Sequence, residues 1–349
     1  MSNDFVISRT DRVLVTGASG FIGAKVVEIL LEYGFTYVRC MTRPSSSRGR
    51  LQAVLERFGT PAGVEVVTGD LTSVQDCARV AEGVSVVLHL AAGFDKSFAG
   101  AFMNSALATR NLMDAYIAGG RPVRFVNVSS FAVYSNLGMK RGQLLDETCP
   151  IEDAPQQRHD AYGFGKLKQE ELVREYGRTR GLRWVILRPG TVYGPGKKDL
   201  TGRIGIDTFG FFMHIGGSNE LPLTYVDNCA EAIVRAGLVP GVDGEVFNVV
   251  DDERMSSAAF LRAYKRRVRR FSMRVPYVLA HVLSHAWEAY SIRSRGQLPP
   301  AFNRRRASAE WKGNRYTNHK LHERLAWTPR VPLREAMARF LDQFPPLGR

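Results

Sequence analysis

Residues 16–23, which read TGASGFIG, decide the fold of this chain. They follow a strand-like apolar run and open residues 21–32, in which apolar side chains recur at helical spacing. Glycine lets a backbone turn sharply and approach a phosphate closely, and the start of a helix offers free N–H groups and a positive dipole end. The GxxGxxG spacing therefore predicts a dinucleotide-binding loop made of Gly17, Ser19, Gly20, Phe21, Ile22 and Gly23.

The first half of the chain alternates strand-like and helical segments. Helical patterns, the longest of them at 99–118 and 162–180, separate the strand-like runs. Strands that are apolar throughout and alternate with helices are typical of a parallel sheet covered on both faces. The sequence therefore predicts an α/β fold, a Rossmann-type doubly wound parallel sheet over residues 1–190. Its strands are expected at residues 12–16, 37–41, 64–68, 84–90, 124–129 and 184–188.

After residue 190 glycines and prolines interrupt the pattern. We expect residues 191–349 to form a smaller, mostly helical substrate-binding lobe that is basic and returns some elements to the sheet. Short strands are expected at 223–226 and 245–249. Helices are expected at 227–238, 256–268, 276–291, 318–325 and 333–344.

The composition is that of an ordinary globular protein, with 349 residues, 44% of them hydrophobic and 23% charged. The four cysteines are scattered and no Cys/His cluster has zinc-ligand spacing, so we expect reduced thiols and no metal site. The sequence shows neither a signal-peptide pattern nor an apolar run of about 18 residues. We therefore expect a cytoplasmic protein without a membrane span.

The positive charge is concentrated in one segment. The net charge is +14, and residues 262–315 carry fourteen Lys and Arg residues against Glu288 and Glu310. That segment therefore has a net charge of +12 and the rest of the chain +2. A local field of this kind bears on a substrate or partner rather than on the fold. We expect an anionic or lipid-linked small molecule and no nucleic acid.

Tyr162 and Lys166 stand four residues apart in a predicted helix, so their side chains share one face. A tyrosine with a pKa of about 10 is a poor base at neutral pH, and a nearby ammonium lowers that pKa by stabilising the phenolate. The pair could then move a proton to or from a hydroxyl while a nicotinamide moves a hydride. In isolation, however, a surface pair is the simpler interpretation of this spacing.

The second predicted strand bears on the cofactor's adenosine end. Residues 38–45 read VRCMTRPS, without the acid that usually binds the ribose hydroxyls of NAD at this place. Arg43, and also Arg39, could instead hold a 2′-phosphate with help from Ser45. We therefore expect an NAD(P) cofactor and favour NADP(H), the alternative being that both arginines are solvated surface residues.

Eight short motifs follow one another along the chain. In this order they resemble the extended short-chain dehydrogenases/reductases of the NAD-dependent epimerase/dehydratase family. The resemblance implies a nicotinamide cofactor and a homodimer formed through the helices at 99–118 and 162–180. The motifs are TGASGFIG (16–23), GDL (69–71), HLAA (89–92), Asn104, VSS with VY (128–130 and 133–134), YGFGK (162–166), RPGTVYGPG (188–196) and YVDN (225–228).

The resemblance also implies the roles of single residues. The family places its Tyr–Lys pair after the fifth strand, as here, which makes Tyr162 and Lys166 the catalytic pair. Ser130 would polarise the substrate oxygen, with Ser129 as the alternative, and Asn104 would help to hold a proton-relay water. Further cofactor contacts are expected from Asp70 and Leu71 near the adenine, from Leu90, Ala91 and Ala92 in the cofactor wall, and from Pro189 and Val192 at the nicotinamide. His89 is expected to be structural.

One departure from the family pattern narrows the reaction. Family members that dehydrate sugars carry Asp-Glu directly after the catalytic hydroxyl residue, whereas this chain has Phe131-Ala132. Two apolar side chains cannot act as general acid or base. We therefore expect an oxidoreductase or an epimerase and not a 4,6-dehydratase.

Three hypotheses for the function remain open. The first is an enzyme for a nucleotide-linked or polyprenyl-diphosphate-linked sugar, whose diphosphate the basic segment would attract. The YVDN motif (225–228) and the long C-terminal lobe also resemble the 3β-hydroxysteroid dehydrogenase branch. The second hypothesis, implied by this resemblance, is an enzyme for a sterol or lipid alcohol. The third is a non-catalytic nucleotide-sensing or RNA-binding protein, against which the intact set of Ser130, Tyr162 and Lys166 argues.

Residues 276–292, PYVLAHVLSHAWEAYSI, are apolar but interrupted by His281, His285 and Glu288. The segment is too polar to span a bilayer. It could lie peripherally on the anionic inner face of the membrane or cap an apolar pocket. The alternative is a helix that packs into the core and leaves a solvated basic face.

Overall fold

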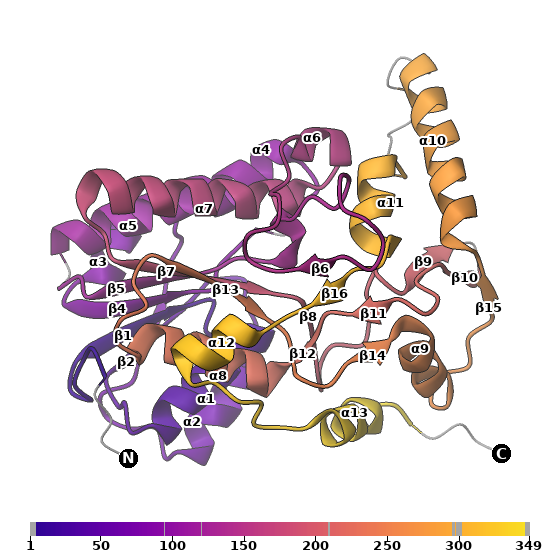
Figure 1. Ribbon diagram of the computed structural model, residues 1–349. Helices are drawn as coiled ribbons and strands as arrows, with labels where there is room; N and C mark the ends of the chain where they lie inside the picture. The colour runs from indigo at the N-terminus through magenta and orange to yellow at the C-terminus, as the bar shows by residue number, and fades with distance from the viewer. Residues whose placement is uncertain are drawn as a thin grey trace.

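The structure is a computed structural model that describes residues 5–93, 95–119, 121–208, 210–294, 297 and 302–345. Its centre is a seven-stranded parallel sheet (Figure 1). The strand order is β13-β7-β5-β4-β1-β2-β3. The strands are β1 (Arg12–Thr16), β2 (Val38–Thr42), β3 (Glu65–Thr68), β4 (Val84–His89), β5 (Arg124–Val128), β7 (Trp184–Pro189) and β13 (Glu245–Val249). The predicted Rossmann-type sheet is confirmed.

Helices cover both faces of this sheet. The strands carry apolar side chains on both sides, so both faces of the sheet must be buried. Alternation along β1 shows why: Val13 and Val15 join one buried cluster and Leu14 the opposite one. One face carries α1 (Phe21–Glu32), α2 (Gly49–Arg57) and α8 (Val226–Leu238). The other carries α3 (Val74–Ala81), α5 (Ala108–Gly119) and α7 (Ala161–Arg180).

The helix expected at 99–118 is interrupted by a turn of a different kind. It begins as α4 (Phe98–Ala101), passes through the π-helix η1 (Phe102–Leu107) and continues as α5. A π turn shifts the faces of the helix that follows it and is frequent at functional sites.

The chain crosses from one half of the sheet to the other at β1, which lies between β4 and β2. The connections after β1 and after β4 therefore diverge and leave a crevice at the carboxyl ends of these strands. The glycine loop at residues 17–20 lies at this crevice, because it directly follows β1 and directly precedes α1.

The C-terminal half belongs partly to the sheet and partly to a smaller lobe. β13 pairs with β7, and α8 packs beside α1, so both complete the Rossmann core. The lobe contains the small sheet β15-β10-β9 and the pairs β12-β8, β11-β14 and β16-β6. These strands are β6 (Leu144–Leu145), β8 (Thr191–Tyr193), β9 (Gly205–Thr208), β10 (Phe211–His214), β11 (Glu220–Leu221), β12 (Leu223–Tyr225), β14 (Met255–Ser256), β15 (Ser272–Arg274) and β16 (Arg315–Tyr316).

Short helices make up the rest of this lobe and of the loops near it. They are η2 (Phe131–Val133), α6 (Pro155–Arg158), α9 (Ser257–Lys265), α10 (Tyr277–Arg293), α11 (Arg304–Trp311), α12 (His319–Leu325) and α13 (Leu333–Asp342). α10 projects from the body of the molecule beside α11 (Figure 1), and most of its residues are exposed. The alternative that the helix of residues 276–292 packs into the core is therefore wrong. No helix among the described residues is long and apolar enough to cross a bilayer.

Candidate active site

A cavity of about 1410 Å³ occupies the crevice at the carboxyl ends of the strands. It runs from the glycine loop, past the ends of β4, β5 and β7, to residues of α11 in the lobe. The residues that the sequence predicts as catalytic or cofactor-binding, from Gly17 to Val192, line it, with the exception of Arg39 and Ser45. The structure thus brings together side chains that are up to 175 positions apart in the chain.

The glycine loop leaves space and hydrogen-bond donors for a dinucleotide's pyrophosphate. Gly17 has a φ of +68°, which favours glycine, and Gly20 N donates to Gly17 O at 2.9 Å to close the turn. Gly20 caps α1 without a side-chain hydrogen bond, so the first N–H groups of the helix face the cavity unblocked. A Cβ at Gly23 would lie 2.1 Å from Gly17 O. These residues therefore fit the phosphate-binding role.

The two arginines that were expected near the adenosine end of the cofactor point in different directions. Arg43 lines the cavity just beyond β2, where it donates to Ala92 O at 2.9 Å. Arg39 points away from it and donates to Glu65 and to the carbonyl oxygens of Val80 and Glu82. The expectation for Arg39 is therefore wrong, because its guanidinium ties β3 and the end of α3 together.

Of the other residues that were expected to contact the adenosine end of the cofactor, only some line the cavity. Asp70 and Leu71 line the cavity, and Asp70 Oδ1 accepts a hydrogen bond from Thr72 N at 2.9 Å. Ser46 lines the cavity beside Arg43, whereas Ser45 is not among the lining residues.

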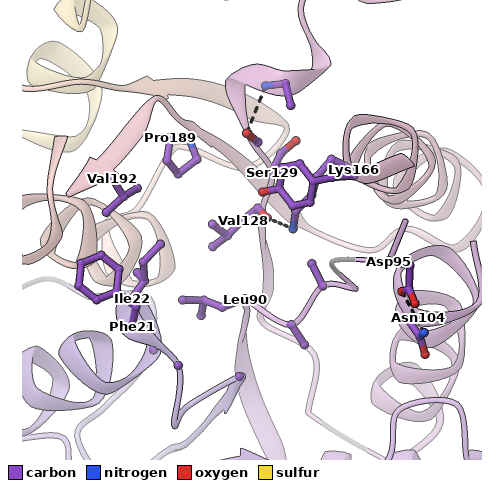
Figure 2. A pocket seen from close by; sticks show the side chains of 18 of the residues that line it. Phe21, Ile22, Leu90, Asp95, Asn104, Val128, Ser129, Lys166, Pro189 and Val192 are labelled. Carbon is purple, nitrogen blue, oxygen red and sulfur yellow. Dashed lines mark hydrogen bonds between the residues drawn. The ribbon is translucent and has the colours of Figure 1, made fainter. Parts of the chain in front are cut away.

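Tyr162 and Lys166 lie on the first turns of α7, whose N-cap Asp160 accepts from Gly163 N at 2.8 Å. Lys166 points toward the end of β5, where its Nζ donates to Val128 O at 2.6 Å and to Gln169 Oε1 at 3.0 Å (Figure 2). The Tyr162 hydroxyl hydrogen-bonds with Ser130, which follows the same strand. Backbone and side-chain contacts from two elements thus hold the Ser130, Tyr162 and Lys166 set in one place.

Burial dominates the acid–base properties of the pair. It raises the pKa of Tyr162 to about 12, although the hydrogen bond to Ser130 acts to lower it. Burial also lowers the pKa of Lys166 to about 7, against the attraction of Glu170. The expected lowering of the Tyr162 pKa by the lysine is therefore wrong for this structure. At neutral pH the phenol keeps its proton and is poised as an acid.

Asn104 lies on the π-helix η1 and lines the same cavity. Its amide Nδ2 donates to Asp95 Oδ2 at 3.0 Å, as Figure 2 shows. The π turn determines which way this residue faces, and nothing in the sequence pattern predicted that turn.

His89 is structural, as expected. It is buried, and its ring nitrogens lie 2.9 Å from Thr16 Oγ1 and from Thr109 Oγ1. Burial, with a contribution from Lys166, lowers the pKa of His89 to about 3 and keeps the ring neutral. Gln169 of α7 also contacts the ring, so His89, at the end of β4, links α7 to β1.

The far half of the cavity contains cationic residues that sequence patterns did not assign. Arg158, Lys197, Arg203 and Arg306 line it, together with His159 and Glu310. Burial lowers the pKa of Lys197, which donates to Val192 O at 3.1 Å. Lys197 stands one residue after the RPGTVYGPG motif, which is the one signal that could have found it.

Most of the basic segment 262–315 does not contribute to the cavity. Among its described basic residues only Arg306 lines it, from α11. Arg304 and Arg305 are paired elsewhere, with Glu288 and with Glu152 and Asp153 respectively. Direct contact with a ligand in the cavity is therefore open to Arg306 alone among these described basic residues. No group of His, Cys, Asp and Glu side chains among the described residues could hold a metal ion.

The fold and the cavity define a Rossmann-type dinucleotide-binding protein with a Ser–Tyr–Lys set at the end of the sheet. The chain belongs to the NAD dependent epimerase/dehydratase family, whose model matches residues 13–249.

The names of similar proteins indicate different substrates. The chain is 27% identical to 3beta-hydroxysteroid-dehydrogenase/decarboxylase isoform 1 of Arabidopsis thaliana, over 97% of this chain and 81% of that protein. It is 33% identical to UDP-glucose 4-epimerase of Azospirillum brasilense, over 56% of this chain and 52% of that protein. The solved UDP-glucuronic acid 4-epimerase from Bacillus cereus, in complex with NAD, has the same fold. It superposes with a TM-score of 0.70 at 22% identity and covers 95% of this chain and 98% of its own.

Proposed function

We propose that this chain is an NAD(P)-dependent oxidoreductase that acts at a secondary alcohol or ketone. The observation that carries the proposal is the shared cavity, which holds the glycine loop at one end and Ser130, Tyr162 and Lys166 beside it. When bound, the nicotinamide supplies or accepts the hydride.

The chain's own residues handle the substrate oxygen and its proton. The Ser130 hydroxyl donates a hydrogen bond to the oxygen and stabilises its developing negative charge. The Tyr162 phenol, which keeps its proton at neutral pH, transfers that proton to the oxygen when a ketone is reduced. Lys166 then stabilises the resulting phenolate from the same face of α7. Asn104, whose amide donates to Asp95, helps to hold a proton-relay water, as the family resemblance implies.

The reaction we propose is net oxidation or reduction, with epimerisation as the alternative and no 4,6-dehydration. Phe131 and Ala132 line the cavity directly after Ser130, and neither can protonate a leaving hydroxyl. A change in nicotinamide absorbance that follows turnover supports net redox. Product formation without such a change supports epimerisation.

We propose NADP(H) as the preferred cofactor. Arg43 supports this because it lines the cavity at the end of β2, where no acid stands to bind ribose hydroxyls. Arg43→Ala is expected to weaken NADP⁺ binding by about tenfold or more, the loss of one charge-assisted hydrogen bond, and to change NAD⁺ binding little. Isothermal titration of both cofactors measures the ratio. An unchanged preference, or tighter binding of NAD⁺ to the native chain, contradicts the proposal.

For the substrate we propose a sterol-like or other lipid alcohol. The similarity to the Arabidopsis 3beta-hydroxysteroid-dehydrogenase/decarboxylase extends over 97% of this chain and so includes the C-terminal lobe. A nucleotide-linked or polyprenyl-diphosphate-linked sugar is the second candidate, which the cationic lining of Arg158, Lys197, Arg203 and Arg306 favours. Panels of hydroxysteroids and of nucleotide sugars, each assayed with both cofactors, decide between them.

Two further proposals concern the state of the protein. A homodimer through η1, α5 and α7 is supported by the exposed apolar side chains Phe102 and Met103 on η1. A reducing, cytoplasmic location is supported by the four free cysteines.

Tyr162→Phe tests the catalytic assignment. It removes the transferable proton and keeps the ring, so turnover is expected to fall by about 10²–10⁴-fold while cofactor affinity stays within a factor of a few. Steady-state rates on the substrate found in the panels, and titration of the cofactor, measure the two effects. Tyr37→Phe, at an exposed tyrosine, is the matched control and should be silent. Native turnover in Tyr162→Phe would refute the assignment.

A further inference from the structure

Helix α10 is oriented with its apolar side outward. Large apolar side chains are exposed along its length, with Val278 at 68% and Ile292 at 74%. Residues 278 and 282 form one stripe at helical spacing and residues 279, 283, 287 and 290 form the neighbouring stripe. The exposed set is Val278, Leu279, Val282, Leu283, Trp287, Tyr290 and Ile292, which we call the outer face of α10.

The side of α10 that packs on the protein is small and polar. Ala280, Ser284 and Ser291 are its buried residues, and Ala280 lies in a cluster with Ala307 and Trp311 of α11. On the same stripe, Glu288 accepts a hydrogen bond from Arg304 Nε at 3.1 Å. A helix on a water-exposed surface has the opposite pattern, with its apolar stripe toward the core. No part of the chain that the structure describes covers the outer face.

The segment that precedes α10 in the chain is strongly basic. Residues 262–274 carry seven Lys and Arg residues and no acid. Arg262, Arg266, Arg269 and Arg274 form no salt bridge within the part of the chain that the structure describes. Phe271, exposed at 74%, and Met273 stand among them and lead through β15 into the helix. Apolar and cationic side chains thus alternate on one continuous segment.

We propose that the outer face of α10, with Phe271 and Met273, docks into the headgroup region of an anionic lipid bilayer. Burial of these side chains in the interface removes apolar area from water, and the arginines of residues 262–274 pair with anionic headgroups. Trp287 and Tyr290 combine an apolar ring with a polar atom, as side chains at membrane interfaces do. α10 has 17 residues and lies in the interface rather than spanning it.

Charge favours a bilayer over a second copy of this chain. A two-fold contact between two outer faces would bring identical basic segments toward each other. An anionic surface instead meets the unpaired arginines with opposite charge. Docking does not require the proposed reaction, because no residue of the outer face lines the active-site cavity.

Vesicle flotation of the full chain tests the proposal. Phosphatidylcholine vesicles are compared with vesicles of equal parts phosphatidylcholine and phosphatidylglycerol, each at low and high salt. The native chain should float with the anionic vesicles only, and less at high salt. V282E/L283E should lower the partition coefficient by about tenfold or more, because it places charge in the buried interface. V74E, at an exposed valine of α3, is the matched control and should bind like the native chain.

A second readout separates docking from misfolding. Trp287 is the most exposed of the four tryptophans, since Trp184 is half-buried and Trp311 and Trp327 are buried. Its emission should shift to the blue with anionic vesicles, and Trp287→Phe should lose that shift while keeping flotation within a factor of a few. Cofactor affinity should be native in every variant. Equal flotation of the native chain and V282E/L283E overturns the proposal, as does a native dimer that V282E/L283E dissociates without any vesicle binding.

Discussion

Ser129 and Ser130 both follow β5 and both line the cavity, but their hydroxyls have different surroundings. Ser130 Oγ accepts from Ala132 N at 3.1 Å and hydrogen-bonds with Tyr162. Ser129 Oγ is buried without a hydrogen-bond partner among the described residues. Ser130 therefore has the position from which a hydroxyl can serve both the phenol and a substrate oxygen.

Ser130→Ala is expected to lower kcat by about 10²–10³-fold, since it removes a donor to the developing negative charge. Ser129→Ala, which keeps the neighbouring hydroxyl in place, is the matched variant and should change kcat little. Steady-state kinetics with saturating cofactor distinguish the two. A larger loss in Ser129→Ala would transfer the role to that residue.

At the level of single residues, the sequence correctly predicted the features that depend only on spacing along the chain. Tyr162 and Lys166 share a face because their spacing matches one helical turn. Arg39 could not be excluded in the same way, because its partners Glu65, Val80 and Glu82 come from β3 and from the end of α3. Their approach is set by tertiary packing. The rise of the Tyr162 pKa has the same origin, since burial dominates it.

At the element scale, the joint between β1 and α1 leaves no space for a further atom. The nearest atoms to a Cβ at Gly23 are backbone atoms of Gly17 and Ala18, at 2.1–2.9 Å, and they cannot turn aside as a side chain could. Gly23→Ala is expected to destabilise the protein by about 1–3 kcal/mol or more and to reduce cofactor binding. Denaturant unfolding and cofactor titration measure both.

Gly119→Ala provides the comparison for that substitution, because the added Cβ at the end of α5 would meet no atom within 4 Å apart from its chain neighbours and its own helix backbone. It should leave stability within about 0.5 kcal/mol of the native value. Equal stability of the two alanine variants would mean that α1 can move away from β1 without a loss of stability.

Elements differ in how far their sequences predict them. The strands of the sheet were found because apolar runs between helical patterns have few other interpretations. The π turn at η1 was not, since the apolar pattern of 99–118 fits an unbroken helix equally well. The exposure of α10 also depends on its neighbours: Ser284 and Ser291 face the protein, against their own hydropathy.

At the scale of the whole molecule, the Rossmann core is not contiguous in the chain. α8 and β13 follow residue 190, yet Ala230, Ile233 and Val234 of α8 are fully buried and β13 completes the sheet beside β7. A fragment of residues 1–190 would expose the core that they cover. We expect no cooperative unfolding transition for it in urea, whereas the full chain should show one. A sharp transition in the fragment would show that the core closes without them.

Helix α11 has two neighbours on opposite sides. Arg306 and Glu310 line the cavity, while Ala307 and Trp311 pack against α10. Helix α11 therefore forms part of the cavity wall on one side and packs against the projecting helix α10 on the other. If a displacement of α10 shifts α11, the width of the cavity changes with it, and by thermodynamic linkage a ligand in the cavity then changes the free energy of that displacement by the same amount.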